Sequence, residues 1–133
     1  MRVFLSTFIA VAVALSLPAC GISGPSANRE DTFSAMLTVG GLNAHTFSAS
    51  KSGEFNVKIT ALSPDSNSIV GTGFGQASGG GCALDPFYQN QRSSLNRTAI
   101  TGPIYQKGAY CIAVFDVGLL TAAQNYTLIV SHP

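Results

Sequence analysis

The chain alternates apolar and polar side chains most cleanly over one stretch, Phe55-Asn56-Val57-Lys58-Ile59-Thr60-Ala61. Alternation with a period of two sends successive side chains to opposite faces of an extended chain. The stretch therefore predicts a β-strand that packs one face on a hydrophobic core and exposes the other face to water.

The same pattern recurs on both sides of this strand, and turn signals separate the runs. Gly40-Gly41 and the cluster Ser63–Ser68 are typical of turns. We expect the strands to cover residues 32–39, 45–50, 55–61, 69–76, 95–100, 110–117 and 126–131. Residues 78–92 are expected to be irregular, and residues 119–123 allow one helical turn. About seven short strands with frequent turns predict an all-β fold, an antiparallel β-sandwich.

Three glycines interrupt the expected strand 69–76 at every second position. They are Gly71, Gly73 and Gly75. Glycine at this spacing leaves one strand face without side chains, so we expect either another segment to pack closely there or the strand to bend.

The N terminus carries a short apolar segment, residues 3–17, directly after Arg2. At about 15 residues it is shorter than the ~20 needed to span a bilayer and matches the core of a signal peptide. The segment ends in Leu17-Pro18-Ala19-Cys20, which resembles the lipobox of bacterial lipoproteins. The alternatives are an ordinary secretory signal cut after Ala19 and a retained membrane helix.

The lipobox resemblance implies an address and a domain division. The signal peptide would be residues 1–19, and Cys20 would carry the acyl chains that hold the protein to a membrane. Residues 20–30 are expected to form a flexible tether, and residues 31–133 the sandwich domain. Gly21 stands where lipoproteins retained in the inner membrane carry aspartate. We therefore expect a bacterial cell-envelope protein anchored in the outer membrane and facing the periplasm.

Charge excludes one class of partner. The sequence has seven Lys and Arg residues and six Asp and Glu residues, and Arg2 leaves with the signal peptide. The mature net charge is about zero and no basic cluster exists, so we expect no nucleic-acid partner.

Cys82 and Cys111 remain once Cys20 is acylated. An even pair in an oxidising compartment predicts a structural disulfide. The alternatives are a metal pair and a redox couple. A redox couple favours C-x-x-C spacing and a zinc site needs about four ligands, and the sequence supplies neither.

Three segments resemble the pre-peptidase C-terminal (PPC-like) domains of bacteria. They are Tyr110–Gly118, Tyr126–Val130 and Phe55–Ser66. The resemblance covers residues 46–133 and implies a β-sandwich of jelly-roll type. Such domains are usually appended to secreted proteases. They are non-catalytic there and have roles in secretion, stability or substrate binding. This chain carries no peptidase, so the fold transfers better than the role.

Catalytic and metal-binding motifs are missing from the sequence. His45 and His132 are the only histidines, and we expect the first at a sheet edge and the second to be frayed next to the last residue. Asp116 is expected to cap a turn rather than to bind calcium, because the other aspartates are scattered. We predict no catalytic residue, metal or cofactor.

The stretch Asp85–Arg92 is the best binding candidate. Its adjacent aromatics and amides, Phe87, Tyr88, Gln89 and Asn90, could stack on a sugar or grip a peptide. The favoured alternative is that both aromatics cover the end of the sandwich. The first functional hypothesis is a lipid-anchored, non-enzymatic binding or adaptor module acting on an envelope protein. The second is a glycan-binding module, and an enzyme ranks third.

Anchoring gives the first testable prediction. Replacing Cys20 by serine removes the thiol that accepts the lipid, so Cys20→Ser should lose the incorporation of radiolabelled palmitate and leave the membrane fraction. A variant that stays equally lipidated and membrane-bound would show that the lipobox interpretation is wrong.

Overall fold

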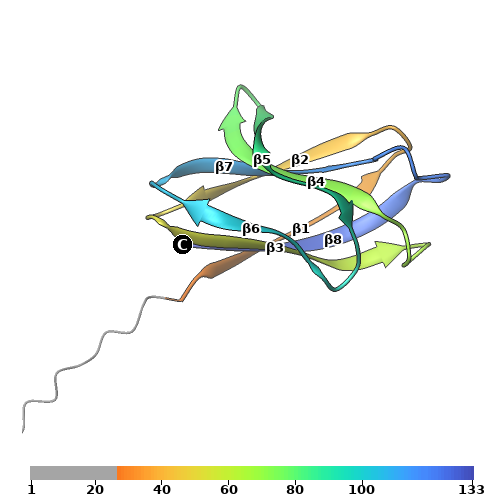
Figure 1. Ribbon diagram of the computed structural model, residues 1–133, viewed down its shortest axis with the longest axis horizontal. Coiled ribbons are helices and arrows are strands. Elements are labelled where there is room, and N and C mark those ends of the chain that lie inside the picture. The colour runs from red at the N-terminus through yellow and green to blue at the C-terminus, as the bar shows by residue number, and fades with distance from the viewer. Residues whose placement is uncertain (1–26) are drawn as a thin grey trace, which may run out of the picture.

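The computed structural model describes residues 27–133, which form eight strands and no helix (Figure 1). The strands are β1 Arg29–Leu37, β2 Leu42–Ala49, β3 Gly53–Ser63, β4 Val70–Ser78, β5 Gly81–Ser93, β6 Thr98–Ile104, β7 Gly108–Phe115 and β8 Gln124–His132. The expected signal peptide, Cys20 and most of the tether lie outside the described residues.

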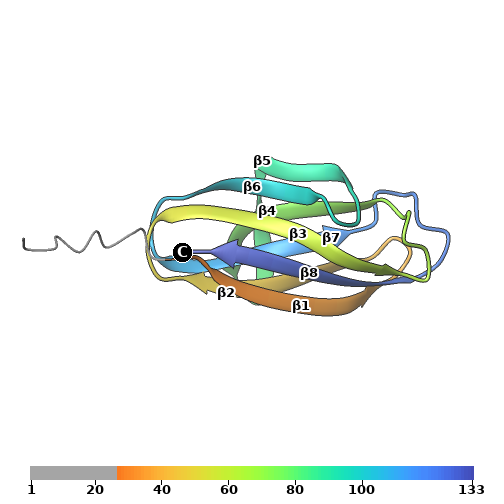
Figure 2. The ribbon, with the colours of Figure 1, turned by 90° about the horizontal axis from the view of Figure 1, so that it is seen from below.

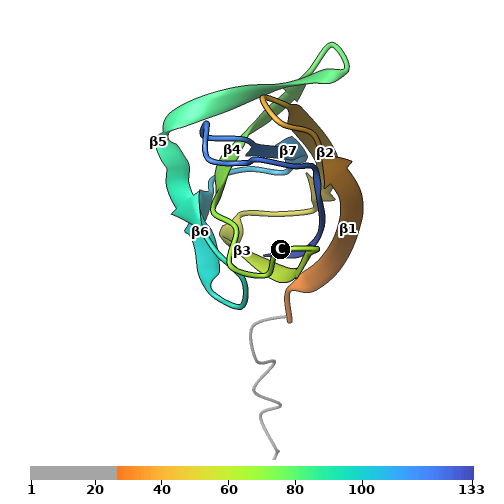
Figure 3. The same ribbon diagram turned by 90° about the vertical axis from the view of Figure 1, so that its right-hand side faces the viewer.

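The strands form two antiparallel four-stranded sheets, in the orders β1-β8-β3-β6 and β2-β7-β4-β5. Figure 2 views the first sheet, and Figure 3 looks along the sandwich and shows the two layers enclosing the core. Apart from the β4–β5 hairpin, consecutive strands belong to opposite sheets. This strand order is that of a jelly roll. The predicted all-β antiparallel sandwich is confirmed.

Aromatic rings stack between the layers at the centre of the core. Phe55 of β3 and Phe74 of β4 lie with ring centroids 3.9 Å apart, and Tyr110 of β7 lies 5.4 Å from Phe74 on its own sheet. All three side chains are buried. Aromatic rings bury large areas and pack in defined geometries, so this stack fixes the distance between the sheets.

The stretch 55–61 keeps its predicted alternation of buried and exposed side chains only as far as Ile59. Phe55, Val57 and Ile59 are fully buried, as expected, but Ala61 is exposed and Leu62 is buried instead. The pairing of β3 with β8 shifts register between Ile59 and Ala61. An extra residue in one strand of a pair reverses the inward face beyond it, so the expectation for Ala61 is wrong.

Residues 78–92 are mostly strand rather than irregular. β5 pairs with β4 along residues 81–84 and again from Gln89, and the register shifts between these two pairings. The stretch 85–88 between them interrupts the alternation that a strand would show. Without that period the sequence carries no strand signal, which explains the error.

Other expected bounds and elements also differ from the structure. β1 begins at Arg29, two residues before the expected domain boundary at Asp31. β6 covers 98–104 rather than 95–100. The stretch 119–123 contains bends and no helical turn.

The three glycines of β4 lie where other groups approach its outer face. A Cβ on Gly71 would stand 2.1 Å from the ring of Phe115, and one on Gly75 would stand 2.0 Å from the carbonyl oxygen of Ala83. A Cβ on Gly73 would meet the Leu84 side chain at 3.0 Å. The predicted close packing is confirmed, because β5 bends over this face and the β4–β5 hairpin rises from the sandwich (Figure 1).

Cys82 and Cys111 form a disulfide that fastens this hairpin to the sheet. Cys82 lies at the start of β5, and Cys111 is fully buried in the middle of β7. The bridge closes a separation of 29 residues. On the loop-entropy model this closure contributes about 3–4 kcal/mol to stability.

The glycine contacts predict an unequal response to added methyl groups. Gly75→Ala should lower the free energy of unfolding by about 1–3 kcal/mol, because its Cβ meets backbone that cannot move without shifting β5. Gly81→Ala is the matched control, since its nearest neighbour is 3.5 Å away and the change should stay within about 0.5 kcal/mol. Urea unfolding followed by circular dichroism measures both. Equal losses would contradict the close approach.

Candidate binding surfaces

The four residues expected to bind a ligand divide between solvent and fold. Phe87 is 88% exposed, and Gln89 is exposed as well. The ring of Tyr88 packs against the hydrophobic core, and the side-chain amide of Asn90 donates to the carbonyl of Ala99 at 2.8 Å. The favoured expectation that both aromatics cover the sandwich is therefore right for Tyr88 and wrong for Phe87.

Asp85 determines which of the two aromatic side chains faces solvent. Its Oδ1 accepts a hydrogen bond from the backbone N–H of Phe87 at 2.8 Å, which is the geometry of an Asx turn. Beyond the turn, the Tyr88 ring stands edge-on to Phe55 and Phe74, with centroids 5.9 Å from each. The turn thus places one aromatic in solvent and its neighbour against the core.

A cavity of about 150 Å³ lies beside Tyr88, between strands from the two sheets. Tyr105 follows β6 at its rim and is 81% exposed. The hydroxyl of Tyr110 donates to the carbonyl of Gln106 at 2.8 Å and holds one wall in place. The lining side chains are Phe74, Gln76, Asp85, Tyr88, Pro103, Ile104, Tyr105, Gln106 and Tyr110. The sequence analysis missed Tyr105, since a single tyrosine in a turn shows no pattern.

The carboxylate of Asp85 is the one charged group among the side chains that line this cavity. Burial raises the pKa of the Tyr88 phenol, and the neighbouring Tyr105 and Asp85 raise it further by disfavouring a second negative charge. A hydrogen bond with the Tyr105 side chain acts in the same direction. The Tyr88 phenol therefore stays protonated at neutral pH and presents a hydroxyl group beside a carboxylate.

A second surface lies at the end of the sandwich that carries the β1–β2 turn and the β7–β8 loop, on the right of Figures 1 and 2. Three large apolar side chains at this end are more than half exposed; we call them the loop-end patch. They are Val39 at 56%, Leu42 at 58% and Leu119 at 61%. Met36 is also exposed, but it lies with Ser34 on the exposed face of β1 in the first sheet. Exposed apolar side chains on neighbouring loops suit contact with a partner.

Asp116 ties together the two loops that carry this patch. Its Oδ2 accepts from the N–H of Gly40 at 2.8 Å, and its Oδ1 accepts from the N–H groups of Gly118, Leu119 and Leu120 at 2.8, 3.0 and 3.1 Å. The hydrogen bond from Gly40 and those from the β7–β8 loop lower the pKa of this carboxyl, against an opposing effect of burial. The predicted turn-capping role is confirmed.

Both histidines are engaged in the structure. His45 lies on β2, an edge strand as expected, stacks on Phe33 at 4.9 Å and hydrogen-bonds the Tyr126 hydroxyl at 2.7 Å. Burial lowers the pKa of His45 below its ordinary value of 6.5. His132 is not frayed: it is fully buried and its Nε2 lies 3.0 Å from a carboxylate oxygen of Asp31. β8 runs between β1 and β3, so its end is held on both sides.

Residues 27–133 contain no group of three or more His, Cys, Asp or Glu side chains that could hold a metal ion. In the same part of the chain no helix is long and apolar enough to cross a membrane. No protein-family model matches the sequence, and neither does any curated protein.

The lowered pKa of Asp116 predicts an acid-sensitive loop end. A carboxyl whose pKa is depressed by folding contributes stability above its ordinary pKa, and the contribution disappears as the pH falls through the lower folded value. Acidification should therefore shift the amide NMR signals of Gly40 and Gly118 together. Asp116→Asn should abolish this joint titration, and Asp65→Asn should leave it intact. A joint titration that survives Asp116→Asn would contradict the assignment.

Proposed function

We propose that this protein is a lipid-anchored, non-enzymatic binding or adaptor module of the bacterial cell envelope that acts on an envelope protein. The lipobox-like segment ending at Cys20 supports the anchor and the outer-membrane location. The resemblance to PPC-like domains is part of the same proposal, and it suggests a partner-binding rather than a catalytic role.

The loop-end patch is the observation that carries the proposal. β1 begins at one end of the sandwich, and the patch lies at the opposite end (Figure 1). A tethered domain would thus hold its most apolar loops away from the membrane. The cap by Asp116 keeps these loops in one arrangement, so binding would cost little ordering entropy.

A groove extends the patch along the outer face of the second sheet. It has a volume of about 460 Å³ and lies between β2 and the start of β5. Leu42 belongs to both the patch and the groove, and Leu84 and Ala113 line the far side. Apolar side chains continuous with a groove suit a protein partner better than a small polar solute.

The contacts of the two histidines do not support a catalytic role for either of them. The ring of His45 is bound to Tyr126, and that of His132 to Asp31, so each has a structural partner. In the described residues, neither stands beside a serine or cysteine nucleophile as a hydrolase would need.

Glycan binding is the second candidate, and one observation favours it. Phe87 is 88% exposed, the most of the large apolar side chains in the described residues. An aromatic face free in solvent can stack on a sugar ring, and Gln89 lies exposed beside it. The crosslinking experiment described next, with its Phe87→Ser control, separates protein binding from glycan binding.

Crosslinking in intact cells tests the proposal. The lipidated protein should capture one envelope protein in a fixed ratio. The double variant Val39→Ser/Leu119→Ser should reduce that capture by roughly tenfold, because it removes apolar side chains from the proposed contact. Both residues are exposed, so the fold should be unaffected.

Phe87→Ser is the control, since it removes a still more exposed apolar side chain from another surface. It should leave the capture of protein unchanged. Absence of any protein partner, together with loss of polysaccharide retention in Phe87→Ser, would replace the adaptor proposal with glycan binding.

A further inference from the structure

We infer that the cavity beside Tyr88 binds a protonated alkylammonium group, the lysine side chain of a partner protein. This inference rests on the proposed adaptor function and identifies the chemistry that one of its contacts recognises. Four features carry it: the ring arrangement, the charge, the acceptor groups and the size of the cavity.

Aromatic rings form the walls. Phe74 and Tyr88 stand perpendicular, with an interplanar angle of 90° and centroids 5.9 Å apart, and Tyr110 lies 5.4 Å from Phe74. Tyr105 completes the lining at the exposed rim. Phe74 and Tyr110 are buried and form the floor, so the aromatic surface within reach of a cation is that of Tyr88 and Tyr105. The π face of such a ring attracts a cation.

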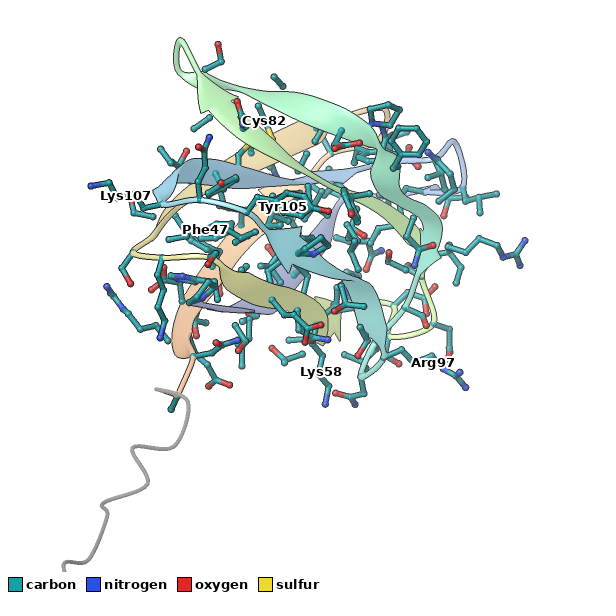
Figure 4. The ribbon with its side chains drawn as sticks, turned by 60° about the vertical axis from the view of Figure 1, so that its left-hand side comes forward. Phe47, Lys58, Cys82, Arg97, Tyr105 and Lys107 are labelled. Atoms are coloured by element: carbon teal, nitrogen blue, oxygen red, sulfur yellow. A yellow bond between two sulfur atoms is a disulfide. The ribbon has the colours of Figure 1, made fainter. Side chains whose placement is uncertain are left out.

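The carboxylate of Asp85 adds a full negative charge at the same cavity. Its Oδ1 is held by the N–H of Phe87, so the charge is fixed in position by the turn. The ion pair in the part of the chain that the structure describes joins His132 to Asp31, and Asp85 is not a member of it. Lys107 is close in sequence, but Figure 4 shows its side chain projecting away from Tyr105.

An ammonium group matches the polar groups around the rings. It has three N–H donors and no acceptor. The cavity offers the carboxylate of Asp85, the hydroxyl oxygens of its tyrosines, and the side-chain amide oxygens of Gln76 and Gln106. The tyrosine hydroxyls and glutamine amides also donate, so the preference for an ammonium group over a neutral sugar rests on the carboxylate of Asp85, the only charged side chain of the lining.

The volume of the cavity favours the end of one side chain over a larger ligand. The cavity of about 150 Å³ is well below the ~300 Å³ at which small-molecule sites begin. It would take the end of one lysine side chain, while the rest of the partner lies on the surface around Tyr105.

The test is an NMR titration of the full-length protein in detergent, observing the ring signals of Tyr88 and Tyr105. The charged probe is Nα-acetyl-lysine methylamide, and its Nε-acetylated form is the uncharged match. The charged probe should give saturable shifts at millimolar concentrations, and the uncharged probe should give none. Glycerophosphoethanolamine, an amine from a lipid headgroup, and N-acetylglucosamine should both bind more weakly, the first because its phosphate is repelled by Asp85.

Asp85→Asn keeps the oxygen that accepts from Phe87 and removes the charge, so it should weaken the lysine probe roughly fivefold or more. Asp65→Asn is the matched control. Asp65 holds the N–H of Asn67 at 2.9 Å in the same kind of turn but lines a different pocket, and its loss should change binding by less than about twofold.

Three outcomes would overturn the inference: no binding of the lysine probe, equal binding of its acetylated form, or unchanged binding in Asp85→Asn. Tighter binding of glycerophosphoethanolamine or N-acetylglucosamine would reassign the cavity to a lipid or a glycan and so also overturn it. Failure of the adaptor proposal looks different. Capture that depends on Val39 and Leu119 but not on Asp85 would leave the adaptor proposal standing and remove only the lysine contact.

Discussion

The missing side chains of Gly71, Gly73 and Gly75 are the constraint on which the rest of this structure depends. Gly73 and Gly75 open the outer face of β4 to within van der Waals contact of β5, and a methyl group on Gly75 would overlap the backbone there. Gly71 leaves the same face open to the ring of Phe115 on β7. Because β5 can bend over this face, its next residues arrive at the edge of the sandwich rather than continuing along it. The Asp85 turn and the inward Tyr88 follow from that bend.

The disulfide and the aromatic stack hold β5 in the bent position that the glycines of β4 allow. Cys111 pairs across the sheet with Gly75, so the bridge to Cys82 lies next to the closest approach of β5. On the other side of the sheet, Phe74 contacts both Phe55 and Tyr88. The hairpin is therefore fixed from both faces of β4, and the cavity beside Tyr88 is formed on rigid elements, as a preorganised site requires.

Periodicity explains how far the sequence predicts this molecule. The alternation in β3 and β8 identifies strands because each has one buried face, whereas β7 is a continuous apolar run buried on both faces. It fails at Ala61, where an extra residue in the strand reverses the faces without a sign in composition. It fails again at β5, whose interruption near Tyr88 removes the alternation.

The candidate site could be predicted only in part, for a related reason. Phe87 and Tyr88 stand out in the sequence as adjacent aromatics, but which of them faces solvent depends on a single turn bond from Asp85. Tyr105 belongs to the cavity only because β6 ends beside β5 in the opposite sheet. His132 is buried because β8 is a central strand, and its position next to the last residue suggests the opposite. Contacts between distant segments leave no local pattern.

Both proposed contacts lie at the borders of the sandwich and not on its broad faces. The loop-end patch is built on turns that Asp116 joins, and the cavity lies between β5 and β6, which are edge strands of different sheets. A packed core holds the two sheets together, and the disulfide fixes β5 to its own sheet, so the distance between the contacts is set by the fold. A partner that used both proposed contacts would have to fit an apolar surface and place a lysine in the cavity at the same time. Two weak contacts at a fixed separation give more specificity than either contact alone, because a partner that satisfies only one loses the other.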